Sequence, residues 1–319
     1  MIELFFLGVG SSSPRPEWGM PGIVIRRKGE IFVFDCGEGF QVSYLQQRLP
    51  INSPMRILIT HLHGDHFFGL MPFLQTLALQ GRKKPLEVYG PKGLEDCLIE
   101  GSMERNYGSY EVKVFEIGEG TLLSTEEYTI RAIKANHSTE SFSYVFQEKP
   151  TPGKFLVDRA EELGIPEGYL RKLLQEGKNV VVKGKVITPK EVLGPPREGI
   201  SVLYSGDTAY NPILTSEVNN IDVLIHETTF SVNEKEEAFE SLHSTTKDAA
   251  KTALSLKAKV LFMIHFSSRY KDLSFLEKEA REVFRRSYLT YKGLKVVLKR
   301  AYEPVKSLDV TFMGHQVET

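Results

Sequence analysis

The chain alternates between short apolar runs and segments in which apolar residues recur every three or four positions. Apolar runs of about four to eight residues predict buried β-strands, and the wider spacing predicts amphipathic helices. The sequence therefore predicts a mixed α/β protein. For the residues after 286 we expect only structure at the edge of a sheet, with His315 at the surface. The predicted strands cover 2–7, 22–26, 31–35, 56–59, 86–89, 128–134, 142–146, 200–204, 221–225 and 259–264. The predicted helices cover 41–48, 70–79 and 273–286, together with a helix that begins at 91–93 and a helix that is capped by 243–246 and ends at 256.

A polar loop directly follows the predicted strand 56–59. Residues 60–66 read Thr-His-Leu-His-Gly-Asp-His and precede a segment with helical period. Imidazole nitrogen and carboxylate oxygen are the atoms that bind zinc and similar divalent metals. Four such residues within six positions, with a glycine that permits a tight turn, are hard to explain as packing. The loop therefore predicts a metal site, with His61, His63, Asp65 and His66 as candidate ligands.

Three other predicted strands also end in metal-ligand residues. His137 follows 128–134, Asp207 follows 200–204 and His265 follows 259–264. Side chains at strand ends converge along one edge of a sheet, so we expect these residues to meet the loop. Together they supply seven ligands, which suffice for two adjacent metals if one carboxylate, most naturally Asp207, bridges them. Two metals about 3.5–4 Å apart can clamp the attacking and leaving oxygens of a phosphodiester.

Two more pairs of residues have candidate roles beside the metals. Glu227 follows the predicted strand 221–225, and His243 lies further along the chain. A Glu–His pair is suited to general acid catalysis, because the carboxylate fixes the imidazole tautomer and keeps a proton ready for the leaving oxygen. Asp35 and Glu38 lie in a sharp turn, where either support of metal-bound histidines or ordinary turn and N-cap chemistry explains them.

Composition places the chain among ordinary globular proteins. It has 319 residues, of which 41% are hydrophobic and 25% charged, with a formal net charge of −1, so a nucleic acid must be held by local basic patches. The two cysteines, Cys36 and Cys97, are too far apart for a CxxC site and too few for a disulfide framework. The apolar N-terminus contains Glu3 and is too short for a signal peptide or a membrane span. We therefore expect a cytoplasmic protein.

Two basic regions are candidates for binding RNA. Residues 149–197 contain ten basic and six acidic side chains, with many prolines and glycines, and predict an inserted arm within a single domain of residues 1–319. Helical pieces at 158–163 and 167–176 and a hairpin at 179–187 are expected inside it. The cluster at 82–84 either complements a helix dipole or contacts phosphate. The candidate RNA contacts are Arg82, Lys83, Lys84, Arg171, Lys172 and Lys178.

Several motifs along nearly the whole chain carry a family resemblance. They are 35–39, the histidine motif at 61–70, 89–93, 193–197, 204–208, His-Glu-Thr-Thr-Phe at 226–230 and His-Ser-Thr at 243–245. With the histidine motif the chain resembles the metallo-β-lactamase superfamily. The last two motifs make it similar to the ribonuclease Z family within that superfamily, which are tRNA 3′-processing endoribonucleases.

The resemblance implies a fold, a ligand set and a substrate. The expected fold is a four-layer αββα sandwich with an inserted tRNA-binding arm, and the expected assembly is a homodimer. The expected partner is precursor tRNA, with no DNA and no membrane. Two Zn²⁺ ions per subunit are implied, with Mn²⁺ or Fe²⁺ as substitutes. The family pattern assigns one zinc to His61, His63 and His137, the other to Asp65, His66 and His265, the bridge to Asp207, proton acceptance to Asp65, and leaving-group protonation to Glu227 with His243.

Two stretches depart from the family pattern. The family's arm carries a Gly-Pro motif, where 164–170 read Gly-Ile-Pro-Glu-Gly-Tyr-Leu. The family's first loop carries Pro-x-Lys-x-Arg-Asn, where 14–20 read Pro-Arg-Pro-Glu-Trp-Gly-Met. Trp18 either stacks on a base or serves core packing or a dimer contact. These departures leave the metal ligands intact and concern how RNA is gripped and whether a terminal CCA is discriminated.

Three other functions compete with the endoribonuclease. The first is a dinuclear hydrolase of small substrates, such as a small phosphodiesterase, arylsulfatase or lactonase, which would need neither a basic arm nor His243. The second is a metal-dependent oxidoreductase on the same fold, with either two irons or one. The diiron type typically has Glu where this chain has His63. The third is an inactive RNA-binding subunit, which would have lost ligands. The sequence therefore favours a zinc-dependent endoribonuclease that removes the 3′ trailer of tRNA precursors.

Overall fold

Two β-sheets form the centre of the fold. The computed structural model describes residues 1–101, 109–300 and 308–313, so His315 lies outside the described residues. Within these ranges the first sheet has eight strands and the second has seven. The strand order of the first sheet is β17 (Leu308–Met313), β16 (Lys295–Arg300), β1 (Ile2–Gly8), β2 (Gly22–Arg27), β3 (Glu30–Phe34), β4 (Met55–Leu58), β5 (Leu86–Gly90) and β6 (Val112–Glu116). The order of the second is β15 (Ser287–Leu289), β14 (Val260–Ile264), β13 (Val223–Glu227), β12 (Ser201–Tyr204), β9 (Phe142–Glu148), β8 (Tyr128–Lys134) and β7 (Gly120–Ser124).

Each sheet is partly parallel, which brings several strand ends to the same side. Strands β3 to β6 pair in parallel, and so do β12 to β15. Strands β1, β2 and β3 pair antiparallel. The carboxyl ends of β4, β12 and β14 therefore carry loops in which the sequence predicts metal ligands, and the carboxyl end of β13 carries Glu227.

The alternation of side chains along the strands builds the layers. On β1, Phe5 faces a cluster shared with the helices, whereas Phe6 faces the other sheet and lies 5.4 Å from Phe262, ring centre to ring centre. On β3, Val33 joins the helix-side cluster, whereas the ring of Phe32 lies 5.1 Å from that of Phe146 in the second sheet. A strand with both faces apolar is the pattern of a sheet that is buried on both sides.

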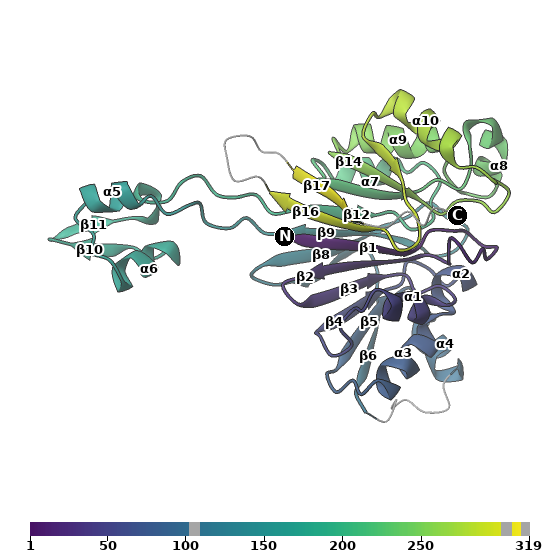
Figure 1. The fold of residues 1–319 in the computed structure, drawn as a ribbon, viewed down its shortest axis with the longest axis horizontal. Helices are drawn as coiled ribbons and strands as arrows, with labels where there is room; N and C mark the ends of the chain where they lie inside the picture. Colours follow the sequence, from purple (N-terminus) through teal and green to yellow (C-terminus); the bar gives the residue numbers. More distant parts are fainter. Residues whose placement is uncertain (102–108, 301–307, 314–319) are drawn as a thin grey trace. The chain divides into compact units, whose positions relative to one another are not determined.

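Helices cover the outer faces of both sheets (Figure 1). The first sheet is covered by α1 (Phe40–Gln46), α3 (Leu70–Leu79) and α4 (Leu94–Gly101), and the second by α9 (Thr246–Ser255) and α10 (Ser274–Val283). This confirms the predicted four-layer αββα sandwich. Among the described residues, no helix is long and apolar enough to cross a membrane.

Several elements were not predicted from the sequence. Helices α7 (Pro212–Glu217) and α8 (Lys235–Glu240) have six residues each, too few for an apolar period to show. Strand β7 is half exposed and lacks clear alternation. The prediction of edge structure after 286 is correct for β17 but wrong for β16, which lies inside the first sheet between β17 and β1. Its partner is the first strand of the chain, and sequence patterns do not report such a distant pairing.

A second compact unit comprises Thr125–Tyr128 and Gln147–Gly199. The range 149–197, which we predict as an inserted arm, lies within it. It contains α5 (Val157–Glu162), α6 (Tyr169–Gln175) and a hairpin of β10 (Val180–Val182) and β11 (Lys185–Ile187), followed by a 3₁₀ turn at Pro189–Glu191. The unit has a small apolar core of its own, composed of Ala160, Ile165, Leu174, Val180, Val182, Ile187 and Val192.

Candidate metal centre

The histidine motif begins where β4 ends and runs into a short helix, α2 (Gly64–Phe67). His61 lies in the loop, His63 occupies the N-cap position of α2, and Asp65 and His66 belong to its first turn. A helix that starts inside the motif turns the third and fourth ligands back toward the first two. The sequence predicted the loop but placed the start of helical structure after the motif.

Close backbone approaches hold this loop in place. The amide of Cys36 donates to the carbonyl of His66 at 2.8 Å, and the amide of Gly69 donates to the carbonyl of Cys36 at 2.9 Å. A Cβ atom on Gly69 would lie 1.8 Å from the carbonyl oxygen of Gly37, and one on Gly37 would lie 2.2 Å from that of Asp65. Only glycine allows such contact, so both glycines are required for the turn at 35–39 to support the motif.

One group of ligand atoms brings together His61, His63, His137 and Asp207, all within 4.8 Å of one another. His63 Nδ1 lies 3.0 Å from His61 Nε2 and 3.3 Å from His137 Nε2. His63 therefore presents Nδ1 to the group, whereas the other two imidazoles present Nε2. Asp207 Oδ2 lies 3.7 Å from His61 Nε2 and 4.0 Å from His137 Nε2.

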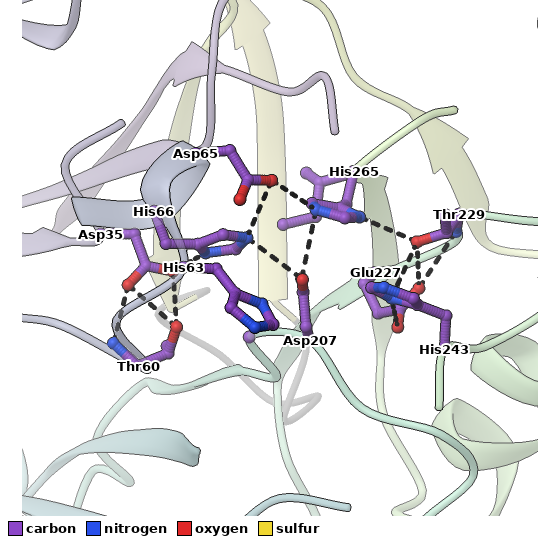
Figure 2. A network of polar contacts seen from close by, with 12 residues as sticks. Asp35, Thr60, His63, Asp65, His66, Asp207, Glu227, Thr229, His243 and His265 are labelled. Carbon is purple, nitrogen blue, oxygen red and sulfur yellow. Dashed lines mark hydrogen bonds and ion pairs between the residues drawn. The ribbon is translucent and has the colours of Figure 1, made fainter. Parts of the chain in front are cut away.

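A second group brings together Asp65, His66 and His265. Asp65 Oδ2 lies 3.4 Å from His265 Nε2 and 3.7 Å from His66 Nε2. The other oxygen of Asp207, Oδ1, lies 3.2 Å from His66 Nε2 and 3.3 Å from His265 Nε2. Asp207 therefore lies between the two groups and turns one oxygen toward each, as Figure 2 shows for the second group.

The donor set of these two groups fits a pair of divalent metals. His66 Nε2 and Asp207 Oδ1 are buried, yet neither is in hydrogen-bonding geometry with any residue that the structure describes. Imidazole nitrogens and carboxylate oxygens that converge within 4.8 Å of one another have the arrangement of a metal site. The seven predicted ligands are thus brought together, and five imidazoles with two carboxylates suit zinc, manganese or iron.

Electrostatics keep the carboxylate of Asp207 ionised and the imidazole of His61 neutral. Burial by itself raises the pKa of Asp207, but the neighbouring His265 and His66 outweigh burial and hold that pKa well below its usual value. Burial, reinforced by neighbouring imidazoles such as that of His66, lowers the pKa of His61 well below its usual value. An ionised Asp207 and a neutral His61 are the protonation states that metal binding requires. For His66, by contrast, burial by itself lowers the pKa, but the carboxylates of Asp207 and Asp35 outweigh burial and raise that pKa well above its usual value.

Asp35 orients ligands of the histidine motif from the side away from the other ligand atoms. It is fully buried and accepts hydrogen bonds from His66 Nδ1 at 2.7 Å, from the Tyr204 hydroxyl at 2.7 Å, and from the amide of Thr60 at 2.7 Å. The Thr60 hydroxyl also donates to it and lies 2.9 Å from His61 Nδ1. Of the two readings of Asp35, support of metal-ligand histidines is therefore the one that the contacts favour. Glu38 is exposed and does not join them.

Glu227 and His243 form a pair beside the second group. The Glu227 carboxylate is fully buried, and its Oε1 lies 2.9 Å from His243 Nδ1. His243 also lies among the ligand atoms of Asp207 and His265, all within 4.8 Å of one another. Burial by itself would lower the pKa of His243, but the carboxylate of Glu227 outweighs it and raises that pKa to about 9.

Sequence patterns missed three residues that orient this centre. They are Thr60, Tyr204 and Thr229, whose hydroxyls contact Asp35 or Glu227. All three lie inside motifs that were recognised, within three positions of a predicted ligand or catalytic residue. The contacts of Thr60 and Tyr204 with Asp35 and of Thr229 with His265 join separate segments of the chain, so motif position is the signal that could have singled these residues out.

The structure changes the list of candidate RNA contacts. Arg82 was predicted as one, and this is wrong, because its side chain is buried and donates to the backbone carbonyls of Ile51, Ser53 and Pro85. Its exposed neighbours Lys83 and Lys84 lie just before β5, at the opposite strand ends from the histidine motif.

The other candidate RNA contacts lie in the second unit. The side chain of Arg171 is only 13% exposed, and its guanidinium donates to the carbonyl of Ile165, which stabilises the unit. Lys172 and Lys178 are exposed and pair with Glu176. In the other unit, the half-buried Trp18 packs edge-on against Phe266, the residue after His265.

The fold and the His/Asp centre are those of a hydrolase of the metallo-β-lactamase fold. Human tRNase Z, short form, has a solved structure with this fold; it is 24% identical, with a TM-score of 0.66, and the match covers 92% of this chain and 98% of that one. A family model described as Anti-Pycsar protein Apyc1 matches residues 2–151.

Two curated relatives match nearly the whole chain. Ribonuclease Z of Nitrosopumilus maritimus is 40% identical over 294 residues, which cover 92% of this chain and 98% of the relative. Ribonuclease Z of Nostoc sp. is 36% identical over 315 residues, which cover 96% and 98%. The chain belongs to the ribonuclease Z family, as the sequence motifs predicted, and its enzyme class is accordingly that of an endoribonuclease.

Proposed function

We propose that this protein removes the 3′ trailer from tRNA precursors by hydrolysing one phosphodiester bond, leaving a 3′-hydroxyl on the tRNA. The observation that carries the proposal is the Glu227–His243 pair. A ring nitrogen of His243 lies within 4.8 Å of ligand atoms of Asp207 and His265, and its Nδ1 lies 2.9 Å from Glu227 Oε1. A leaving group that needs a proton, such as a ribose 3′-oxygen, explains why an acid lies beside the metals.

Two divalent metals, zinc by ligand chemistry, would be held by the two groups of residues. His61, His63 and His137 would hold one, Asp65, His66 and His265 the other, and Asp207 would bridge them. When bound, such a pair supplies Lewis-acid stabilisation of phosphoryl oxygens and lowers the pKa of water to near 7. Mn²⁺ or Fe²⁺ would suit the same donor atoms.

Asp65 is the proposed acceptor of the proton from the attacking water. Hydrogen bonding to His265 and the nearby imidazole of His66 outweigh burial and lower the pKa of Asp65, so its carboxylate is ionised at neutral pH. The water oxygen forms the new bond to phosphorus while the bond from phosphorus to the ribose 3′-oxygen breaks. The proton of the water passes to the carboxylate.

His243 is the proposed donor of the proton to the leaving 3′-oxygen. Its Nδ1–H is held by Glu227 Oε1, so Nε2 is the atom that can deliver a proton to substrate. Because the pKa of His243 is about 9, the imidazole carries that proton at neutral pH. Positioned general acids contribute about 10²–10⁴-fold to rate.

The basic residues of the second unit are the proposed grip on the folded RNA. Lys172 and Lys178 are exposed there, and so are Lys183, Lys185 and Lys190 on and after the β10–β11 hairpin. Contacts between lysine and phosphate hold RNA by backbone and shape rather than by sequence. No DNA partner is part of the proposal, and a cytoplasmic location agrees with a precursor tRNA substrate.

A homodimer is the proposed assembly. Helices α1 and α3 pack against each other. On their surfaces Val42 is 51% exposed, Leu45 40% and Leu79 87%, so large apolar side chains remain uncovered there. Such side chains gathered on adjacent helices suit a second copy of the chain. Molecular mass in solution tests this, and a monomer at micromolar concentration would contradict it.

The experiment that tests the proposed function compares two substrates with one variant. The zinc-loaded protein and His243→Ala are incubated with a precursor tRNA and with a small phosphodiester whose leaving group, nitrophenolate, needs no proton. We expect His243→Ala to lose about 10²-fold or more on the tRNA but little on the small ester. Equal losses on both substrates would contradict the role of His243, and hydrolysis of the small ester alone by the unmodified protein would favour a small-substrate hydrolase.

A further inference from the structure

The hydroxyl of Thr229 contacts both the general acid pair and a metal ligand. Its Oγ1 lies 2.7 Å from Glu227 Oε2, 2.8 Å from His265 Nδ1 and 3.3 Å from His243 Nδ1 (Figure 2). The amide of Thr229 also donates to Glu227 Oε2 at 3.0 Å. Thr229 is 6% exposed, so water does not compete for these contacts.

The direction of each hydrogen bond follows from the number of protons. Glu227 is ionised and can only accept, so the single hydroxyl proton of Thr229 goes to Oε2. The lone pairs of the Thr229 hydroxyl are then left to accept from His265 Nδ1–H. His265 consequently keeps its proton on Nδ1 and turns the lone pair of Nε2 toward Asp65 and Asp207. This is the tautomer that a metal ligand needs.

His265 has an unusual backbone conformation for a candidate ligand. Its φ is 62°, in the left-handed region that non-glycine residues seldom adopt. Its ring is held by side-chain contacts, which stack it on His243 and place Nδ1 against Thr229. On the side away from Asp207, the Thr229 hydroxyl is the contact that the ring nitrogen makes.

The other end of the centre is built in the same way. The hydroxyl of Thr60 lies 2.9 Å from His61 Nδ1 and donates to the buried carboxylate of Asp35. Asp35 thus contacts His66 directly and His61 through Thr60. In the same way, Glu227 contacts His243 directly and His265 through Thr229. The recurrence, from residues far apart in the sequence, indicates that a threonine relay is a feature of this centre.

We propose that Thr229 is a positioning residue whose hydroxyl transmits the orientation set by Glu227 to the metal ligand His265, so that the general acid pair and the second metal group form one hydrogen-bonded unit. The inference rests on the proposed two-metal function. It predicts that Glu227, which is not a metal ligand, affects metal affinity and does so through Thr229.

Substitutions at Thr229 test the relay by metal binding rather than by activity. Zinc affinity of the full chain is measured by competition with a chelator for Thr229→Val, which keeps shape but lacks the hydroxyl, and for Thr229→Ser, which keeps the hydroxyl. Thr228→Val is the matched control, because Thr228 is also buried and its hydroxyl donates to the carbonyl of Ile264 instead. We expect the weaker zinc site to lose about 10- to 100-fold in affinity in Thr229→Val only.

A double-mutant cycle separates the relay from a merely structural effect. Glu227→Gln is expected to weaken zinc binding when Thr229 is present and to have little further effect in Thr229→Val. Losses that add independently would overturn the proposal, and so would a Thr229→Val protein that binds zinc as Thr228→Val does. If the unmodified protein binds no zinc through these residues, the proposed function falls as well, so the two failures are distinguishable.

Discussion

Replacing Asp35 by asparagine perturbs the centre without touching a ligand. The carboxylate accepts from the Thr60 amide and hydroxyl, from His66 Nδ1 and from the Tyr204 hydroxyl. In Asp35→Asn one oxygen becomes an NH₂ group, which cannot accept. If that group faces His66, it donates to Nδ1 and moves the imidazole proton to Nε2, the atom that would bind metal.

The magnitude follows from the number of donors that lose an acceptor. About two buried donors lose their partner, at about 1–3 kcal/mol each, so Asp35→Asn should cost about 2–6 kcal/mol of stability. For a protein of this size that is a drop of about 2 °C in Tm per kcal/mol. The wrong tautomer of His66 should in addition weaken metal binding by about 10- to 100-fold or more.

Asp222→Asn supplies the matched control for this substitution. Asp222 is another buried carboxylate, which accepts from the Ser201 amide and hydroxyl and pairs with Lys259 at 2.8 Å and Arg300 at 2.6 Å. Both variants are assayed metal-free by thermal unfolding and then by zinc competition. We expect both to lose stability and only Asp35→Asn to lose zinc affinity. Equal zinc affinity in the two variants would refute the role given to Asp35.

Three further outcomes follow from the structure. Glu227→Gln removes the charge that raises the pKa of His243. Because kcat falls at alkaline pH where this imidazole loses its proton, the fall should move to lower pH in the variant. A pH profile of kcat that does not move would exclude His243 as the acid. Arg82→Ala should lower the free energy of unfolding by about 2–5 kcal/mol by leaving buried carbonyls without a donor, with KM for precursor tRNA unchanged; a raised KM in a stable variant would restore Arg82 as an RNA contact. Lys172→Glu with Lys178→Glu should raise KM for tRNA and reduce its salt dependence while hydrolysis of a small phosphodiester stays the same; tRNA kinetics equal to those of the unmodified protein would exclude this surface.

The sequence predicted the parts of the centre that local pattern reports. His61, His63, Asp65 and His66 share one short motif, and strand ends supplied the remaining ligands. The structure adds the hydrogen bonds that the ligand histidines make with residues outside the ligand set, such as Asp35 and Thr229. That His63 uses Nδ1 and the others Nε2 depends on the N-cap position of His63 in α2, which no pattern of apolar residues contains.

The failures have a common physical cause. Arg82 is basic and follows a helix, so it looks like a surface residue, but three carbonyls from two loops surround its guanidinium. Strand β16 is recognised only through its pairing with β1, almost 300 positions earlier. The pairing of β16 and two of the three Arg82 contacts, with Ile51 and Ser53, therefore involve segments distant in the chain.

The most direct test of the central claim maps both ends of the cut RNA. The purified, zinc-loaded protein is incubated with a precursor tRNA that carries a 3′ trailer, beside His63→Ala. We predict a single cut at the 3′ side of the acceptor stem, with a 3′-hydroxyl on the tRNA and a 5′-phosphate on the trailer, and no cut by His63→Ala. A precursor left intact by a preparation that hydrolyses a small phosphodiester would contradict tRNA processing and leave only the metal centre standing.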